Sequence, residues 1–96
     1  VLFRSVEAAL VLHPGIHEAA VYAVPDERLG EEVGATVFGD PGLDPDEIRT
    51  FLGAHLARFE VPKYIYISPE PLPRIASGKI LKRQLRDEAA KRLAGG

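Results

Sequence analysis

Residues 71–83 read PLPRIASGKILKR, and the rest of the chain is organised around them. Two prolines restrict the backbone on the approach, while Ser77 offers a helix N-cap and Gly78 a position that is free to bend. The apolar periodicity that begins at Ile80 predicts a helix, with Lys79 in its first turn. A cation loses about 0.3–1 kcal/mol there, because the helix N-terminus carries partial positive charge. An anionic ligand would explain Lys79 at this position, and the alternative is a solvated lysine at a fraying helix end.

The composition describes one small domain and excludes several classes of site. The chain has 96 residues and a formal net charge of −2, so no basic field would attract nucleic acid or an anionic membrane. It has no cysteine, which excludes disulfides, thiol nucleophiles and zinc–thiolate sites and is typical of cytoplasmic proteins. No apolar run approaches the roughly 18 residues of a transmembrane helix, and no signal peptide is recognisable. We expect a cytoplasmic domain without a transmembrane segment.

Apolar patterns predict three helices and three strands. The segment IHEAAVYAV is nearly apolar on both faces, which is typical of a central strand covered on both sides. Two further segments alternate apolar residues as strands do. The expected strands are Ile16–Val24, Glu32–Phe38 and Tyr64–Ile67, and the expected helices are Val6–Leu12, Asp44–Ala57 and Ile80–Leu93.

The middle helix has the most complete start signals. Asp44 is placed as N-cap, Pro45 as the first helical residue, and Glu47 three residues after the cap. The apolar residues that follow have the spacing of one core-facing stripe, which predicts that all of them pack inward: Ile48, Phe51, Leu52, Leu56 and Phe59.

The run Pro-Arg-x-x-Ser-Gly-Lys-Ile-x-Lys-Arg around Lys79 resembles the final core motif of the adenylate-forming (AMP-binding) enzymes. This superfamily comprises acyl-CoA synthetases, luciferases and the adenylation domains of peptide synthetases. The resemblance covers residues 6–93 and implies the family's small C-terminal domain at 6–96. That domain is an α+β fold, with a small, mainly antiparallel three-stranded sheet flanked by helices. The sequence of residues 24–39 most resembles the corresponding segment of the fatty-acyl and other carboxylic-acid CoA ligases.

The resemblance also implies a role for each residue of the motif. Lys79 would be the catalytic lysine of adenylation, and Arg74, Ser77 and Gly78 would shape a substrate-binding loop. In this family a carboxylate attacks the α-phosphate of Mg-ATP to give an acyl-adenylate and pyrophosphate, and coenzyme A then displaces AMP. ATP, Mg²⁺ and CoA would thus serve the full-length enzyme, and this domain alone would bind none of them.

The partner that the resemblance implies is the large N-terminal adenylation domain of the same enzyme. The phosphate loop, the adenine-binding motif and the acyl pocket of the family belong to that domain. We therefore expect the isolated chain to be inactive, and the carboxylic acid that it serves cannot be read from the sequence.

Residues 1–5 fit neither a signal peptide nor the family. Leu2–Ser5 is what the nucleotide sequence CTCTTCCGATCT encodes, which is the end of a common sequencing adapter. We expect residues 1–5 to be a non-native lead-in.

Alternatives stay open beside the ligase. One is a catalytically silent interaction domain of the same fold, and another is an adenylation-domain fragment of a peptide synthetase. A nucleic-acid or phosphate-binding module would use Lys79 with three further cations, but it is disfavoured by the net charge and because only Tyr64 and Tyr66 are closely spaced, exposed candidates for base stacking. The further cations are Lys82, Arg83 and Arg86.

A metal site is not expected. His13 and His17 could share an ion, but no set of carboxylates or cysteines completes the coordination.

Overall fold

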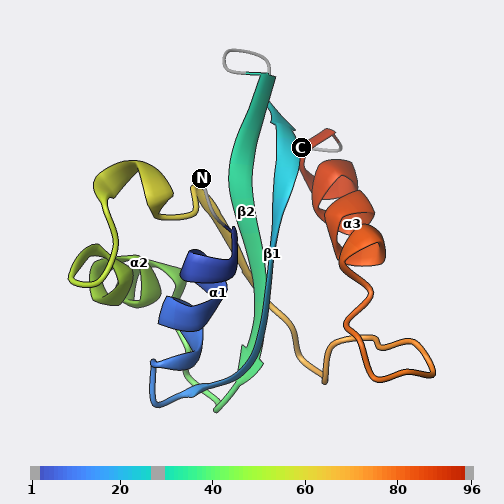
Figure 1. The fold of residues 1–96 in the computed structure, drawn as a ribbon, viewed down its shortest axis with the longest axis horizontal. Helices are drawn as coiled ribbons and strands as arrows, with labels where there is room; N and C mark the ends of the chain where they lie inside the picture. Colours follow the sequence, from blue (N-terminus) through green and yellow to red (C-terminus); the bar gives the residue numbers. More distant parts are fainter. Residues whose placement is uncertain (1–2, 27–29, 95–96) are drawn as a thin grey trace.

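The structure, a computed structural model, describes residues 3–26 and 30–94 (Figure 1). The elements along the chain are α1 (Phe3–Val11), β1 (Ile16–Asp26), β2 (Gly30–Gly39), α2 (Pro45–Gly53), the short 3₁₀ helix η1 (Arg58–Glu60), β3 (Tyr64–Ile67) and α3 (Lys82–Ala94). This order confirms the expected α+β class, with three strands and three α-helices in the described residues.

The three strands form one mixed sheet in the order β1-β2-β3. β1 and β2 pair antiparallel over most of their length, and β3 adds parallel to β2, with Gly34 opposite Tyr64 and Val37 opposite Ile67. The sheet is mainly antiparallel, as expected. The prediction that Ile16–Val24 is the central strand is wrong, because β2 lies between the other two. Apolar residues on both faces of a strand report that both faces are covered, whatever its place in the sheet.

Helices cover both faces of the sheet, as Figure 1 shows, with α1 and α2 on one side and α3 on the other. Residues that alternate along each strand therefore enter two different cores. The first core contains Val6, Leu10, Val21, Val33, Ala35, Val37, Ile48, Leu52 and Ile65. The second contains Ala20, Tyr22, Val24, Leu72, Leu85 and Ala89.

A register shift near the start of β1 changes which face its residues occupy. Ile16 pairs with Gly39 and Glu18 pairs with Phe38, so one extra residue, His17, is inserted in β1. Ile16 packs in the first core, and regular alternation from it would place residue 18 on the same face. After the shift Ala19 takes that face instead, and Glu18 lies on the side of α3. β-bulges re-aim side chains in this way.

The start of α2 is as predicted and its end is not. The Asp44 side chain caps the helix by accepting from the Glu47 N–H at 3.3 Å, with Pro45 in the first turn. The helix ends at Gly53 instead of Ala57, because glycine is a poor helix former and the chain then turns into η1. As a result Phe59 is 72% exposed, so its prediction as a core residue is wrong.

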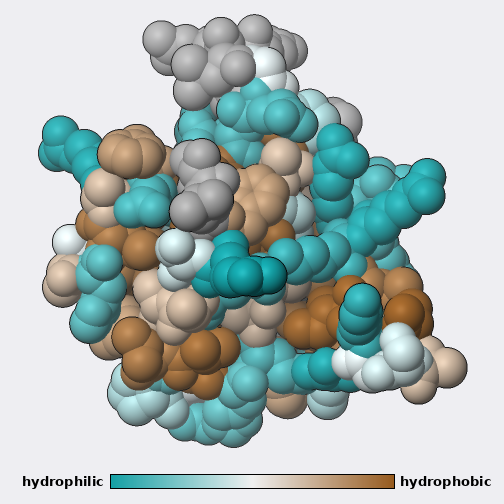
Figure 2. All heavy atoms as spheres, in the orientation of Figure 1, coloured by the Kyte–Doolittle hydropathy of each residue, from teal (hydrophilic) through white to brown (hydrophobic). Residues whose placement is uncertain are grey.

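α1 begins three residues earlier than predicted, at Phe3, whose ring packs against the first core. Of the predicted lead-in, residues 1–2 lie outside the described residues, and the non-native origin of 1–5 stays a prediction. Just after the other end of the helix, Leu12 is 63% exposed. Figure 2 shows that hydrophobic residues reach the surface on this face of the molecule.

Candidate active site

Residues 74–80 form a tight hairpin that precedes α3. Arg74 and Ile80 form an antiparallel bridge, the Ile75 N–H donates to the Lys79 carbonyl at 2.9 Å, and the Gly78 N–H donates to the Ile75 carbonyl at 2.8 Å. Gly78 has φ +91°, a left-handed conformation that glycine adopts without steric cost. These are the features of a three-residue hairpin loop with glycine at the bulge position.

The prediction that Lys79 lies in the first turn of a helix is wrong. α3 begins at Lys82, and Ser77 is an exposed turn residue instead of an N-cap. The Leu81 N–H donates to the Pro73 carbonyl at 2.9 Å, so the hairpin keeps the backbone extended up to the start of α3. The argument from helix-dipole repulsion therefore does not apply to Lys79.

The hairpin fixes the backbone of Lys79 and leaves its side chain exposed. Within residues 3–26 and 30–94, the Lys79 ammonium makes no hydrogen bond or ion pair. The side chain of Ser77, at the tip of the same turn, likewise has no hydrogen bond to any described residue. The arrangement thus offers an exposed cation on a piece of backbone that the hairpin holds, which suits the binding of an anion.

Arg74 connects the two arms of this hairpin and links the hairpin to β1. Its Nη1 donates to the Gly78 carbonyl at 2.7 Å, and its Nε donates to Oε2 of Glu18 in β1 at 3.1 Å. Nη2 also contacts the same Glu18 oxygen. The structure therefore brings Arg74, Gly78 and Lys79 together, with the Arg74 guanidinium occupied by protein acceptors.

Glu18 is a residue that the sequence analysis missed. Its side chain is 15% exposed, and besides binding Arg74 it accepts the Leu72 N–H at 3.2 Å. Leu72 is itself buried in the second core, so the approach to the hairpin is anchored to the sheet. The signal in the sequence was an acidic residue inside the nearly apolar run IHEAAVYAV.

The basic residues at the start of α3 are less available than a nucleic-acid site would require. Lys82 pairs with Glu7 at 2.7 Å, and the Arg86 Nε donates to the Ala23 carbonyl at 2.9 Å. The prediction that Tyr64 and Tyr66 are exposed for base stacking is wrong, because both rings pack against the second core.

Two basic side chains of the chain itself lie near these tyrosine rings. Arg92 lies 4.7 Å from the Tyr66 ring and Lys63 lies 5.4 Å from the Tyr64 ring.

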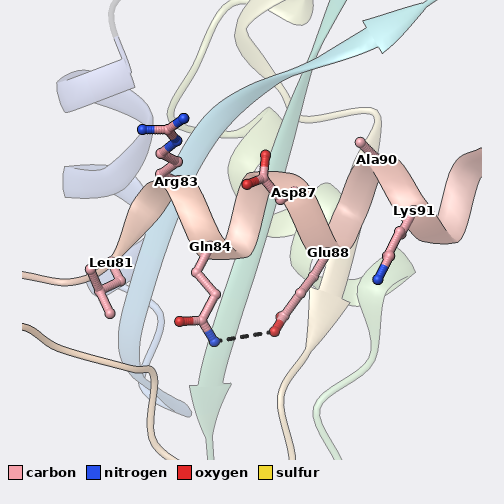
Figure 3. Close-up of a pocket in the computed structure, with 7 residues that line it drawn as sticks. All are labelled: Leu81, Arg83, Gln84, Asp87, Glu88, Ala90 and Lys91. Atoms are coloured by element: carbon pink, nitrogen blue, oxygen red, sulfur yellow. Dashed lines mark hydrogen bonds between the residues drawn. The ribbon is translucent and has the colours of Figure 1, made fainter.

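Figure 3 shows a shallow hollow along α3 with seven lining residues. Its side chains come from Leu81 and successive turns of one helix and carry both signs of charge, and the Gln84 side chain donates to Glu88 at 3.3 Å. A hollow lined by one helix does not surround a ligand as a pocket between elements would.

His13 and His17 do not share a site. The His13 Nε2 lies 2.8 Å from a Glu47 oxygen, and its Nδ1 accepts the Gly15 N–H at 3.0 Å. His17 pairs with Asp40 at 2.9 Å. In the part of the chain that the structure describes, no three His, Cys, Asp or Glu side chains gather as metal ligands.

Among the described residues, no helix is long and apolar enough to cross a bilayer.

Comparisons with known proteins agree on one family. The family model for the AMP-binding enzyme C-terminal domain matches residues 5–79, up to Lys79. The fatty acid–[acyl-carrier-protein] ligase ScoC of Streptomyces coeruleorubidus is 47% identical over 85 residues, which are 85% of this chain and 16% of that protein. Oxalate–CoA ligase of Arabidopsis thaliana is 39% identical over 80 residues, covering 81% of this chain and 15% of that protein.

A solved structure supports the same assignment. The fatty acyl CoA synthetase of Mycobacterium tuberculosis superposes with a TM-score of 0.85 and 35% identity, over 92% of this chain and 18% of that chain. The chain thus spans less than a fifth of the length of these relatives. It belongs to the AMP-binding enzyme C-terminal domain family, the small C-terminal domain of adenylate-forming enzymes, and is most like that of acyl-CoA synthetases.

Proposed function

We propose that this chain is the part of an ATP-dependent acid–CoA ligase that brings Lys79 to the adenylation half-reaction. The observation that carries this proposal is the exposed Lys79 ammonium, which has no partner among the described residues although its backbone is held by the hairpin. A silent interaction domain has no physical need for an unpaired cation on a fixed loop.

The chemistry of adenylation explains why a lysine is suited to this position. A carboxylate oxygen attacks the α-phosphorus of ATP, and the bond to the departing pyrophosphate breaks. Negative charge grows on the α-phosphate oxygens, where a preorganised ammonium lowers the barrier. In the second half-reaction the thiol sulfur of CoA attacks the acyl carbon, and AMP leaves with the oxygen that had joined it to the acyl group.

The remaining ligands would be held by a large N-terminal domain of the same protein. The hollow along α3 is lined by one helix, which makes it a poor candidate for enclosing a nucleotide. In this account ATP arrives with Mg²⁺, and the large domain holds both, together with the carboxylic acid and CoA, while Lys79 of this chain approaches the α-phosphate. The isolated chain is accordingly inactive, and its cysteine-free composition is typical of a cytoplasmic enzyme.

We infer a fatty acid as the substrate from the sequence of residues 24–39 and from the names of two relatives, ScoC and the fatty acyl CoA synthetase of Mycobacterium tuberculosis. The name of the Arabidopsis relative specifies oxalate, so the same small domain accompanies different acids. The acceptor in this proposal is CoA, and the name of ScoC, which specifies an acyl-carrier protein, supplies the alternative.

The proposal is tested by acid-dependent pyrophosphate release from the full-length protein that carries this chain. With ATP, Mg²⁺ and a panel of fatty acids, we expect release that Lys79→Ala slows at least about 100-fold. Lys91→Ala, which removes an exposed lysine of α3, is the matched control and should leave the rate unchanged. Equal rates in the two variants would overturn the proposal. The acceptor is identified by offering CoA and an acyl-carrier protein separately and weighing the product.

A further inference from the structure

We propose that Glu18 is a positioning residue for Lys79, which it holds in place through Arg74 and the Leu72 N–H. The inference rests on the proposed function of Lys79 and extends it to a residue of β1, far from the lysine in sequence. Its first support is that three donors converge on one carboxylate: the Leu72 N–H, the Arg74 Nε and the Arg74 Nη2. The first comes from the approach to the hairpin and the other two come from its first arm.

These hydrogen bonds connect Glu18 to the backbone of Lys79 through Arg74 and Gly78. Arg74 uses two of its nitrogens on Glu18 and a third, Nη1, on the Gly78 carbonyl at 2.7 Å. That carbonyl belongs to the peptide bond that joins Gly78 to Lys79. A carboxylate in β1 thus fixes the peptide unit from which the Lys79 side chain departs.

The alternation of β1 is the second support. Glu18 is in regular register with Ala20, Tyr22 and Val24, which pack in the second core together with Leu72. The bulge at His17 lies before this regular stretch and re-aims Ile16, which packs in the first core. The strand therefore presents the Glu18 carboxylate on the side of the sheet where the hairpin lies.

The ion pair also separates the roles of the two cations of the hairpin. Arg74, whose side chain is 46% exposed, is paired with a carboxylate that is only 15% exposed. Lys79 is left as the hairpin cation without a partner among the described residues. Removing the Glu18 charge would loosen the hairpin and also leave the Arg74 guanidinium to compete for the anion that Lys79 binds.

The test uses Glu18→Gln in the full-length protein, because glutamine keeps the shape of the side chain and removes its charge. Glu7→Gln is the matched control, since it breaks the 2.7 Å ion pair with Lys82 at the start of α3 and leaves the link between Glu18 and Arg74 intact. For Glu18→Gln we expect acyl-adenylate formation to slow about 10- to 100-fold, the scale of a small misplacement of a catalytic group. Thioester formation from supplied acyl-adenylate should be unchanged, and Glu7→Gln should affect neither step.

A double-mutant cycle shows whether Glu18 acts through the lysine. In a Lys79→Ala background, Glu18→Gln should slow adenylation no further. If it slows adenylation equally in both backgrounds, or slows both half-reactions equally, the positioning role is wrong while the role of Lys79 stands. A neutral Lys79→Ala would instead overturn the proposed function, and this inference with it.

A second variant keeps the test decisive if Glu18→Gln destabilises the fold. If the melting temperature of Glu18→Gln is lower than that of Glu7→Gln, Arg74→Gln is measured as well. This variant breaks the same ion pair by changing its more exposed partner. The selective loss of adenylation should persist in Arg74→Gln, and a normal adenylation rate there would overturn the proposal.

Discussion

Glu18 and Arg74 are 56 residues apart in the chain, and the Arg74 Nε donates to the Glu18 Oε2 at 3.1 Å. The contact joins the hairpin that carries Lys79 to β1, one of the two edge strands of the sheet. Because Leu72, just before the hairpin, is buried in the second core, the hairpin is attached at its base as well as through its arginine. The position of Lys79 is therefore a property of the tertiary fold.

Replacing Gly78 should weaken the hairpin through backbone strain alone. Its φ is +91°, and a Cβ at this position would meet nothing within 4 Å. We expect Gly78→Ala to lower the free energy of unfolding by about 1–2 kcal/mol, the cost of a left-handed conformation for a non-glycine residue. Gly53→Ala, at the end of α2 and also with open space, should instead stabilise by about 0.5–1 kcal/mol. Urea denaturation of both variants measures the difference, and equal effects would contradict the assignment of Gly78.

Gly39 is expected to tolerate no side chain, because backbone lies against it. A Cβ there would be 1.9 Å from the Gly15 carbonyl oxygen, which also accepts the Asp40 N–H at 2.8 Å. Backbone cannot move aside as a side-chain tip can, so Gly39→Ala should cost about 1–3 kcal/mol or more. Thermal unfolding checks this, and a melting temperature equal to that of the parent would show that the Gly15–Gly39 approach is looser than described.

His13 is expected to contribute more to stability than its acidic partner. The ring is 7% exposed and accepts the buried Gly15 N–H, whereas the Glu47 side chain is largely exposed. His13→Leu leaves that N–H without its acceptor and should cost about 1–3 kcal/mol. Glu47→Gln removes an exposed charge and should cost less than about 1 kcal/mol. The two values come from chemical denaturation at neutral pH, and the reverse order would show that the ion pair dominates.

Tyr22 should make the stability of the domain fall at high pH. Burial raises the pKa of Tyr22 above its usual 10.0, against the opposing effect of its 2.6 Å hydrogen bond with Thr36. The folded-state pKa is thus above that of the unfolded chain, so the contribution of the neutral phenol is fully present below about pH 10 and is lost as the pH rises through the folded-state pKa.

The comparison for this prediction is Tyr22→Phe, which cannot ionise. It should be about 0.5–1.5 kcal/mol less stable at neutral pH, because it loses the bond to Thr36. Above pH 10 its unfolding free energy should fall less steeply than that of the parent. Parallel curves from urea titrations across this range would mean that Tyr22 is not responsible for the loss.

Local signals in the sequence were sufficient for much of the fold. The strands were found from their apolar patterns, and the beginning of α2 from Asp44 and Pro45, because capping is a local interaction. The end of α2 was missed, since the apolar spacing continues past Gly53 although the helix does not.

The structure around the motif depends on interactions that local patterns do not encode. Ser77-Gly78 is compatible with a helix cap and with a hairpin turn, and the pairing of the hairpin arms decides for the turn. Ile80 packs against the second core as part of an extended arm, not as a helical residue. The link from Glu18 to Arg74 joins residues 56 positions apart in the chain, so no local pattern in the sequence predicts it.

The most direct test of the account measures both half-reactions of Lys79→Ala in the full-length protein. If Lys79 stabilises only the transition state of adenylation, the variant should form acyl-adenylate at least about 100-fold more slowly. It should still convert supplied acyl-adenylate and coenzyme A to thioester at close to the parental rate. Equal damage to both steps would show that Lys79 holds the hairpin or the fold together, and no damage to either would show that it is an ordinary solvated lysine.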